Sequence, residues 1–137
     1  MLTAADLEVN VLDFRERTFQ FDRLVDVGRR TYAVFSRTET ESERQLRPKL
    51  VHLTVVVPLE EVILDEASDA LRIGRPRTGT VAPGAAAVEV AAEPPEFEEG
   101  GLRWKRVALG SSSYAYVLLD LADTLLSREG RAGLGLP

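Results

Sequence analysis

Alternating apolar and polar side chains predict β-strands in the first half of the chain. The strongest pattern runs from Leu50 to Val57, where most positions on both faces are apolar, as is typical of a strand inside a sheet. Residues 18–27 and 31–36 alternate on either side of Gly28, which predicts a β-hairpin. Residues 37–49 carry mainly charged side chains, and we expect a mobile loop or a solvated helical turn there.

Two further strand patterns lie in the second half of the chain. Residues 85–92 alternate between apolar and polar positions, and residues 102–109 do so directly after the turn residues Gly100 and Gly101. The acidic stretch 93–99 lies between these two patterns. We interpret it as a long, exposed hairpin tip.

Helical spacing of apolar residues predicts a helix near each end of the chain. Residues 3–17 open with a partial capping box formed by Thr3 and Asp6, although alternation over residues 7–11 leaves a strand as the rival. Residues 114–126 have a wide apolar face, which predicts an amphipathic C-terminal helix packed on the sheet. The serines at 111–113 are expected to cap that helix.

A third helix is predicted over residues 59–71. Pro58 suits the first turn of a helix, and Glu60 and Glu61 follow where the helix dipole favours acids. A strand through residues 62–64 is the alternative.

These elements predict an α+β fold with a largely antiparallel sheet of five to six strands and three helices. Residues 1–130 are expected to form a single domain, with 131–137 as a flexible tail. In element order alone, the chain resembles compact α+β domains of the secretion-chaperone type. If residues 59–71 are a strand, the alternative is a pleckstrin-homology-like β-barrel with a C-terminal helix.

Composition narrows the function classes. The chain has 137 residues, no cysteine and a net charge of −5. The absence of cysteine excludes disulfides and thiolate sites, and the acidic balance disfavours general nucleic-acid binding. No membrane span or secretion signal is expected, so we interpret the protein as soluble and cytoplasmic.

Catalytic and metal-binding patterns are weak. His52 is the single histidine and lies within the strongest strand pattern, so a structural role is the favoured interpretation. Glu61, Asp65 and Asp69 would form one stripe on a helix, but their spacing matches no calcium loop and a solvated face is expected. We therefore predict no catalytic residue, no metal and no cofactor, and we favour a protein that is not an enzyme over an enzyme.

The junction before the expected C-terminal helix is the best candidate for anion or ligand binding. Free N–H groups at the start of a helix attract anions. Arginines in a segment rich in glycine and proline are the candidate companions. The residues of this candidate site are Gly110, Ser111, Ser112, Ser113, Arg72, Arg75 and Arg77.

A second candidate site lies on the late strand. Basic residues interleaved with an aromatic ring can bind phosphates and stack bases. Here these residues are Arg103, Trp104, Lys105 and Arg106. Pairing of Arg103 and Lys105 with acids on a neighbouring strand, such as Glu89, is the structural alternative.

The sequence favours a non-catalytic protein-interaction or oligomerising module, acting as a homodimer or with a protein partner. The alternatives are a small-ligand or phosphate-binding protein that uses the serine-rich junction, and a nucleic-acid accessory protein that uses Trp104.

Overall fold

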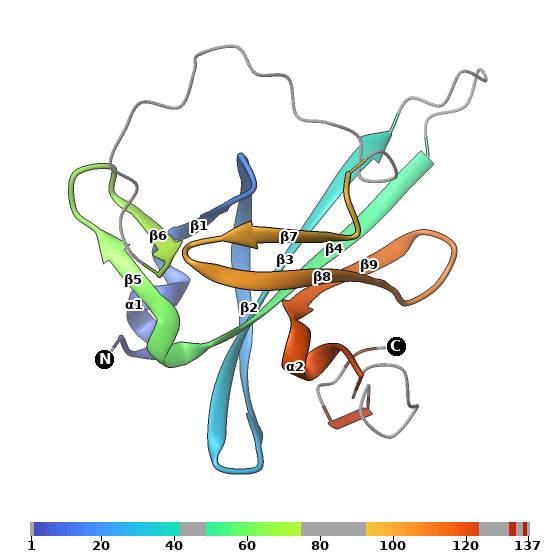
Figure 1. Cartoon of the computed structure of the whole chain (residues 1–137). Helices are drawn as coiled ribbons and strands as arrows, with labels where there is room; N and C mark the ends of the chain where they lie inside the picture. The colour runs from blue at the N-terminus through green and yellow to red at the C-terminus, as the bar shows by residue number, and fades with distance from the viewer. Residues whose placement is uncertain (1, 42–48, 75–92, 124–131, 134–135, 137) are drawn as a thin grey trace.

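The computed structural model describes residues 2–41, 49–74, 93–123, 132–133 and 136. Their main feature is one nine-stranded mixed sheet that curls into a half-barrel (Figure 1). The strands are β1 (Val11–Phe14), β2 (Arg17–Val27), β3 (Arg30–Glu41), β4 (Lys49–Pro58), β5 (Val62–Asp65), β6 (Ala70–Ile73), β7 (Glu96–Glu99), β8 (Leu102–Ala108) and β9 (Ser113–Leu118). The helical elements are α1 (Ala4–Glu8), the 3-10 turn η1 (Leu59–Glu61) and α2 (Leu119–Ala122).

The expected α+β fold is wrong. The strand order is β5-β6-β1-β2-β3-β4-β9-β8-β7, and two of the junctions, β1 with β6 and β4 with β9, are parallel. The α-helices α1 and α2 are five and four residues long, so the described chain is mostly sheet. The order of elements therefore does not follow the secretion-chaperone type. Among the described strands, β5 and β7 are the two edges of the sheet, unlike the strands of the closed barrel considered as the alternative.

The helix predicted over residues 59–71 is one of the wrong elements. Only η1 is helical, and it is followed by β5 and β6, which pair antiparallel from Val62 opposite Ile73 to Asp65 opposite Ala70. The alternative of a strand through residues 62–64 is confirmed. Proline and the two acids mark a helical first turn correctly, but pairing with β6 ends that turn after three residues.

The amphipathic helix predicted over residues 114–126 is also wrong. Residues 113–118 form β9, which lies between β4 and β8, and helix α2 begins only at Leu119. Tyr116 belongs to the core on one side of the sheet and Val117 to the core on the other. A strand that is buried on both faces is apolar at nearly every position, and this pattern also satisfies helical spacing. Residues 124–126 lie outside the described ranges.

At the N-terminus the predicted helix is correct only in its first part. The capping box is present, because the Thr3 hydroxyl accepts a hydrogen bond from the Asp6 N–H while the Asp6 side chain accepts one from the Thr3 N–H. The helix ends at Glu8, and β1 takes over three residues later. Arg15 and Glu16 both have positive φ and form the tight turn into β2. A strand is present in this segment, but at Val11–Phe14 and not over residues 7–11, where the alternation suggested it.

The remaining strand predictions have mixed outcomes. The hairpin around Gly28, the central strand at residues 50–57 and the strand at 102–109 are confirmed as β2–β3, β4 and β8. The loop expected at 37–49 is wrong at both ends, because β3 continues to Glu41 and β4 begins at Lys49, and residues 42–48 lie outside the described ranges. The strand expected at 85–92 lies wholly outside the described residues, and the tail at 131–137 lies mostly outside them.

The sheet has a core on each side. The inner core draws buried side chains from all nine strands and from Leu7 of α1, so it fills the concave side of the curl. Phe14 lies at its centre, with ring centroids 5.0 Å from Trp104, 5.5 Å from Tyr116, 5.9 Å from Phe97 and 6.0 Å from Phe19.

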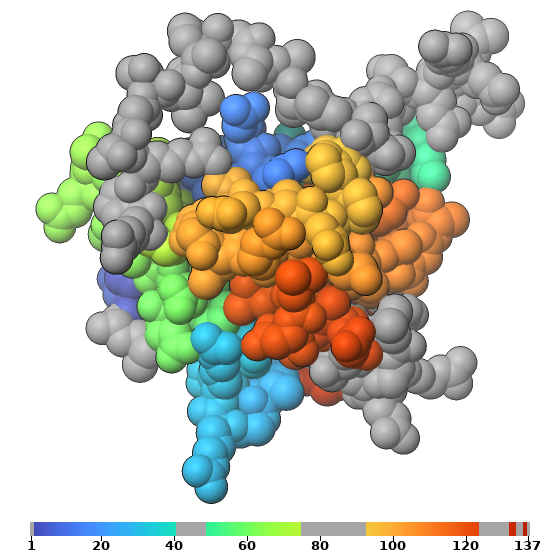
Figure 2. All heavy atoms as spheres, in the orientation of Figure 1, coloured from blue at the N-terminus to red at the C-terminus, as the bar shows by residue number. Residues whose placement is uncertain are grey.

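The outer core is smaller. It lies on β3, β4, β8 and β9, where Leu121 and Ala122 of α2 cover it together with Leu136. In the space-filling view α2 lies below β8, and the tip of the β2–β3 hairpin projects from the body (Figure 2).

Two glycines bring distant parts of the sheet together. Gly74, at the end of β6, and Gly100, in the β7–β8 turn, are so close that a Cβ added to Gly74 would lie 1.8 Å from the Gly100 carbonyl oxygen. In the strand order β6 is second and β7 and β8 are last, so this contact almost closes the curl (Figure 1). Only glycine leaves room for such an approach between backbones.

Candidate functional site

The most concentrated group of charges is a cluster of ion pairs on the inner face of the sheet. At its centre is the Glu93 carboxylate, whose side chain is 3% exposed. It accepts from Arg15 at 2.9 Å, from Arg17 at 2.8 Å and from the Tyr116 hydroxyl at 3.4 Å. Arg15 lies in the β1–β2 turn, Arg17 begins β2 and Tyr116 lies on β9, so Glu93 joins two distant parts of the sheet.

Further contacts extend this Glu93 cluster. The Arg17 Nε donates to both oxygens of Glu39, at 3.1 and 3.0 Å, and Arg37 also donates to Glu39. Arg106 donates to the backbone oxygen of Glu93 at 3.2 Å. The Arg15 guanidinium lies 4.0 Å from the centre of the Phe97 ring, a cation–π contact.

The electrostatics of the Glu93 cluster favour fixed charges over proton transfer. Burial acts to lower the pKa of Arg17, but the hydrogen bond to Glu39 and the charge of Glu93 outweigh it, so the net direction is upward. Burial, and then the nearby Glu93 charge, raises the pKa of the Tyr116 hydroxyl well above its ordinary value. Within the described part of the chain, every buried side-chain nitrogen and oxygen has a hydrogen-bond partner. The ion pairs and hydrogen bonds of the cluster therefore link strands β2 and β9.

The interpretation of residues 93–99 as an exposed tip needs correction at both ends. Glu93 and Glu99 are buried, and the actual turn is Gly100 and Gly101, both with positive φ. Glu99 accepts a hydrogen bond from the Arg15 N–H at 3.2 Å. Groups distant in sequence meet both acids, guanidinium groups at Glu93 and a backbone N–H at Glu99, and no local pattern contains that information.

The anion site predicted at the serines loses its structural basis. Ser113 begins strand β9, so residues 110–112 do not precede a helix. The Ser111 carbonyl oxygen accepts from Lys49 at 2.8 Å, and the Ser112 carbonyl oxygen accepts from the His52 N–H at 2.8 Å.

Arg72 does not join these serines. It lies on β6, five positions from β9 in the strand order, and donates to Asp65 at 2.8 Å and Asp13 at 3.0 Å. Carboxylates thus already occupy its guanidinium. Arg75 and Arg77 lie outside the described residues.

The predicted nucleic-acid site on β8 also lacks the exposed aromatic ring that it requires. Trp104 is fully buried in the inner core, and its indole N–H donates to the Glu99 carbonyl at 3.0 Å, so it presents no face for base stacking. Arg106 is held by Glu93, as described above. Arg103 and Lys105 lie opposite Glu98 and Glu96 of β7. Acids on the neighbouring strand therefore lie opposite both basic residues, and Glu89 lies outside the described residues.

The other polar candidates do not converge. His52 is exposed on β4, with Nδ1 3.1 Å from the Thr38 hydroxyl. Glu61, Asp65 and Asp69 lie on a 3-10 turn, a strand and a turn, so they share no helical stripe. Over the described ranges, no three acidic or histidine side chains are placed to hold a metal ion.

Asp65 gives a test of the contact with Arg72. The hydrogen bond from Arg72 is the largest of the effects that hold the pKa of Asp65 below its ordinary 3.8. A lowered carboxyl pKa stabilises the fold above 3.8 and loses that contribution as the pH falls through the folded-state value. Asp65→Asn should therefore destabilise the protein at neutral pH, and the difference from wild type should shrink in acid. Urea unfolding at both pH values tests this. Glu66→Gln, at the next position, is the control. A difference in stability between Asp65→Asn and wild type that does not change with pH would contradict the prediction.

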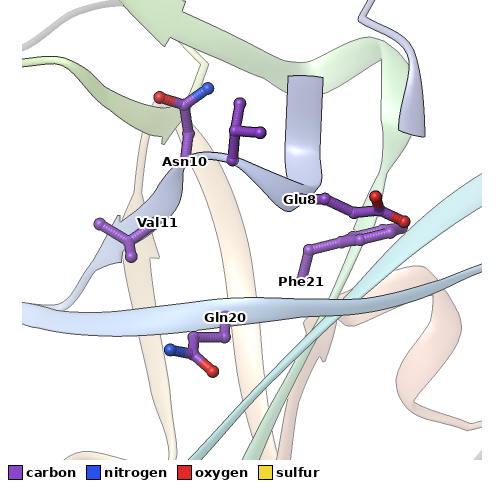
Figure 3. A pocket seen from close by; sticks show the side chains of 6 residues that line it. Glu8, Asn10, Val11, Gln20 and Phe21 are labelled. Atoms are coloured by element: carbon purple, nitrogen blue, oxygen red, sulfur yellow. The ribbon is translucent and has the colours of Figure 1, made fainter. Parts of the chain in front are cut away.

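An open pocket lies where α1, β1 and β2 meet (Figure 3). Its volume is about 360 Å³, and it is lined by Glu8, Val9, Asn10, Val11, Gln20 and Phe21. Val9 is 81% exposed and Val11 is 37% exposed, whereas Phe21 is half-buried and packs against the inner core. We call this feature the α1–β2 pocket. It is an open surface pocket with a mostly polar lining, on which Val9 and Val11 are exposed, and not an enclosed cavity.

Local structure explains why apolar side chains are exposed in the α1–β2 pocket. Leu7 and Leu12 fill the inner core, so the connection between them turns Val9 outward. The Asn10 amide donates to the Asp6 carbonyl at 2.8 Å and closes the C-terminal end of α1. Sequence reasoning missed this pocket. The one available signal was that Val9 falls off the helical stripe of its neighbours.

Comparison with known proteins adds no assignment. No family model matches the chain, no curated protein matches its sequence, and no solved structure matches its fold. Over the described ranges, no helix is long and apolar enough to cross a membrane.

Proposed function

We propose that this chain is a non-catalytic protein-interaction module that binds a partner through the α1–β2 pocket. The observation that carries the proposal is the exposure of Val9, at 81%, in the same pocket as Val11 and Phe21. Val9 and Val11 are the two exposed apolar side chains of the pocket, and exposed apolar side chains that lie close together are typical of protein-binding surfaces.

The form of the pocket supports a macromolecular partner over a small ligand. Small-molecule sites enclose most of the ligand surface. The α1–β2 pocket has Val9 and the exposed Glu8 and Gln20 on its walls, so a molecule within it stays open to water on one side. An apolar side chain projecting from another protein fits such a site, because the rest of the partner then covers the opening.

The ion pairs formed by the buried and half-buried charged residues support a non-catalytic role. The Glu93 cluster holds its arginines with carboxylates, and Arg72 is held by Asp13 and Asp65. Ion pairs of this kind fix strands in place. In contrast, Val9 and Val11 stay exposed in the α1–β2 pocket without a comparable structural benefit.

Selection of short random peptides displayed on phage tests the proposal. We expect peptides that bind the wild-type chain and lose binding when Val9 and Val11 are both replaced by serine. Both side chains are exposed, so the fold should tolerate these changes. Leu50→Ser is the matched control, since Leu50 is 58% exposed on β4, away from the pocket. Equal enrichment on wild type and on the double variant would overturn the proposal.

A further inference from the structure

We propose that the second half of strand β2 is a docking edge, to which an extended segment of a partner protein adds as a further strand. Strand β2 pairs with β3 from Gln20 to Val27, whereas β1 covers only residues 17–20 on the other side. Over the described part of the chain, residues 21–27 therefore pair with a strand on one side only. We call residues 23–27 the β2 edge. The inference goes beyond the proposed function, because it adds a second contact surface beside the α1–β2 pocket.

A β-bulge explains why β1 does not cover this edge. The register between β2 and β3 shifts between Phe21 and Arg23, directly after the pair of Val11 with Gln20 that begins β1. A bulge bends its strand, increases the local twist and often ends pairing. Beyond the bulge, β2 and β3 continue as a hairpin without β1 (Figure 1), and the tip of this hairpin projects from the body (Figure 2).

Main-chain groups point outward along the β2 edge. The β2–β3 hairpin closes with Val27 opposite Arg30, and the hydrogen bond of a two-residue turn joins such a closing pair. In an antiparallel ladder, bonded pairs alternate with pairs whose N–H and C=O groups point to the other side. Val25 and Val27 therefore bond to β3. Leu24 and Asp26 direct their main-chain groups to the uncovered side, with the spacing that an added antiparallel strand requires.

The side chains of the β2 edge suit an extended apolar segment with one basic residue. Val25 and Val27 pack against the outer core on one face. On the other face Leu24 lies opposite Ala33 of the inner core and is 39% exposed. Apolar side chains on an added strand would cover Leu24 and Val25, and a basic side chain opposite the exposed Asp26 would pair with its carboxylate.

The β2 edge continues the α1–β2 pocket. Gln20 and Phe21 line the pocket, and the edge begins two residues later. A strand that pairs antiparallel with the edge would run from Val27 towards Arg23 and bring its C-terminal end to the pocket. This continuity favours one extended segment of a partner, held by main-chain pairing along the edge.

A second copy of the chain fits the β2 edge less well. Two-fold pairing centred on Leu24 would place Asp26 opposite Asp22 of the other copy, and pairing centred on Asp26 would place that acid opposite itself. Like charges directly opposite one another destabilise a pair of strands. Pairing centred on Val25 would place Leu24 opposite Asp26, an apolar side chain against a charged one. A partner with a basic residue opposite Asp26 avoids each of these conflicts.

A capped peptide, Val-Lys-Val-Ile-Glu, tests the inference. Paired antiparallel, its lysine lies opposite Asp26 and its isoleucine opposite Leu24, while its central valine lies opposite Val25. Binding to the wild-type chain is followed by NMR titration, together with amide hydrogen exchange. We expect exchange of the Leu24 and Asp26 N–H groups to slow in the bound state. Exchange at Val25 should not change, because its N–H already bonds to β3.

N-methylation of the peptide separates strand pairing from general adhesion. A methyl group on the lysine or isoleucine nitrogen removes a donor to the β2 edge and should weaken binding about two- to tenfold, the usual value of one backbone hydrogen bond. A methyl group on the central valine nitrogen, which points away from β2, is the matched control and should change little.

Variants of Asp26 test the same contact on the protein. Asp26→Pro removes an N–H that β3 does not use, so it should abolish peptide binding while the melting temperature stays near that of wild type. Asp26→Ala keeps the N–H and loses only the carboxylate, and it should weaken binding at most about fivefold.

The possible results separate the inference from the proposed function. Equal binding of the three methylated peptides, or unchanged exchange at Leu24 and Asp26, would overturn the inference, whether or not Asp26→Pro folds. A wild-type dimer in sedimentation that Asp26→Pro abolishes would assign the edge to a second copy and also overturn it. The Val9 and Val11 double variant should still bind the peptide along the edge, so its loss of phage-selected peptides tests the proposed function alone.

Discussion

Replacing Glu93 with alanine should lower the free energy of unfolding by about 3–5 kcal/mol, the usual cost of removing one partner from a buried ion pair. The substitution leaves Arg17, whose side chain is 4% exposed, with only part of its carboxylate shell. It also removes the acceptor of Arg15 and of the Tyr116 hydroxyl. The loss is large because burial prevents water from replacing these contacts.

Chemical denaturation of Glu93→Ala measures this loss. Glu96→Ala is the matched control, because Glu96 is an exposed acid three residues away and removing an exposed charge costs little. Glu93→Gln should give an intermediate result, since it keeps an acceptor oxygen but not the charge. A Glu93→Ala protein as stable as Glu96→Ala would show that the Glu93 cluster does not hold the strands together.

Gly100→Ala should be as damaging as the loss of Glu93, although it adds a single methyl group. The new Cβ would lie 2.1 Å from the backbone oxygen of Ile73, and φ at this position is +64°. A left-handed conformation costs a residue with a side chain about 1–2 kcal/mol, and overpacking adds about 1–3 kcal/mol, so we expect a total of about 2–5 kcal/mol.

The neighbouring glycine separates these two contributions. Gly101 has a φ of +79°, and nothing lies within 4 Å of a Cβ built there. Gly101→Ala should therefore show only the conformational cost of about 1–2 kcal/mol. Thermal unfolding of the two variants under the same conditions makes the comparison. Equal losses would mean that the contact between β6 and the β7–β8 turn does not stabilise the curl of the sheet.

The sequence predicts strands well where one face of the strand meets water. Strands β2 and β3 alternate because their outer faces are partly exposed, and the turn at Gly28 marks the hairpin between them. Strand β9 is apolar on both faces, so its pattern could not be told from a helix. In residues 59–71, the local signals describe η1 correctly, but the long-range pairing of β5 with β6 decides the rest.

The candidate sites were harder to predict than the strands. The burial of Glu93 depends on Arg15 and Arg17, which approach it only after the sheet has curled. The basic neighbours of Trp104 suggest nucleic-acid binding, but its position on β8 directs it into the inner core. Val9 gave the one local hint, an apolar residue outside the helical stripe, and its exposure depends on where α1 ends.

The parallel junction between β4 and β9 has a consequence for the order in which the chain folds. The β2–β3–β4 meander joins neighbours in sequence, so its pairing closes only short loops. The β4–β9 junction brings His52 to Ser113, and the entropy of closing that long loop must be lost before any of its hydrogen bonds form. Topologies dominated by such distant contacts reach the native state slowly. The meander is therefore the expected nucleus, and β8 and β9 should attach to it late, when the inner core closes around Phe14.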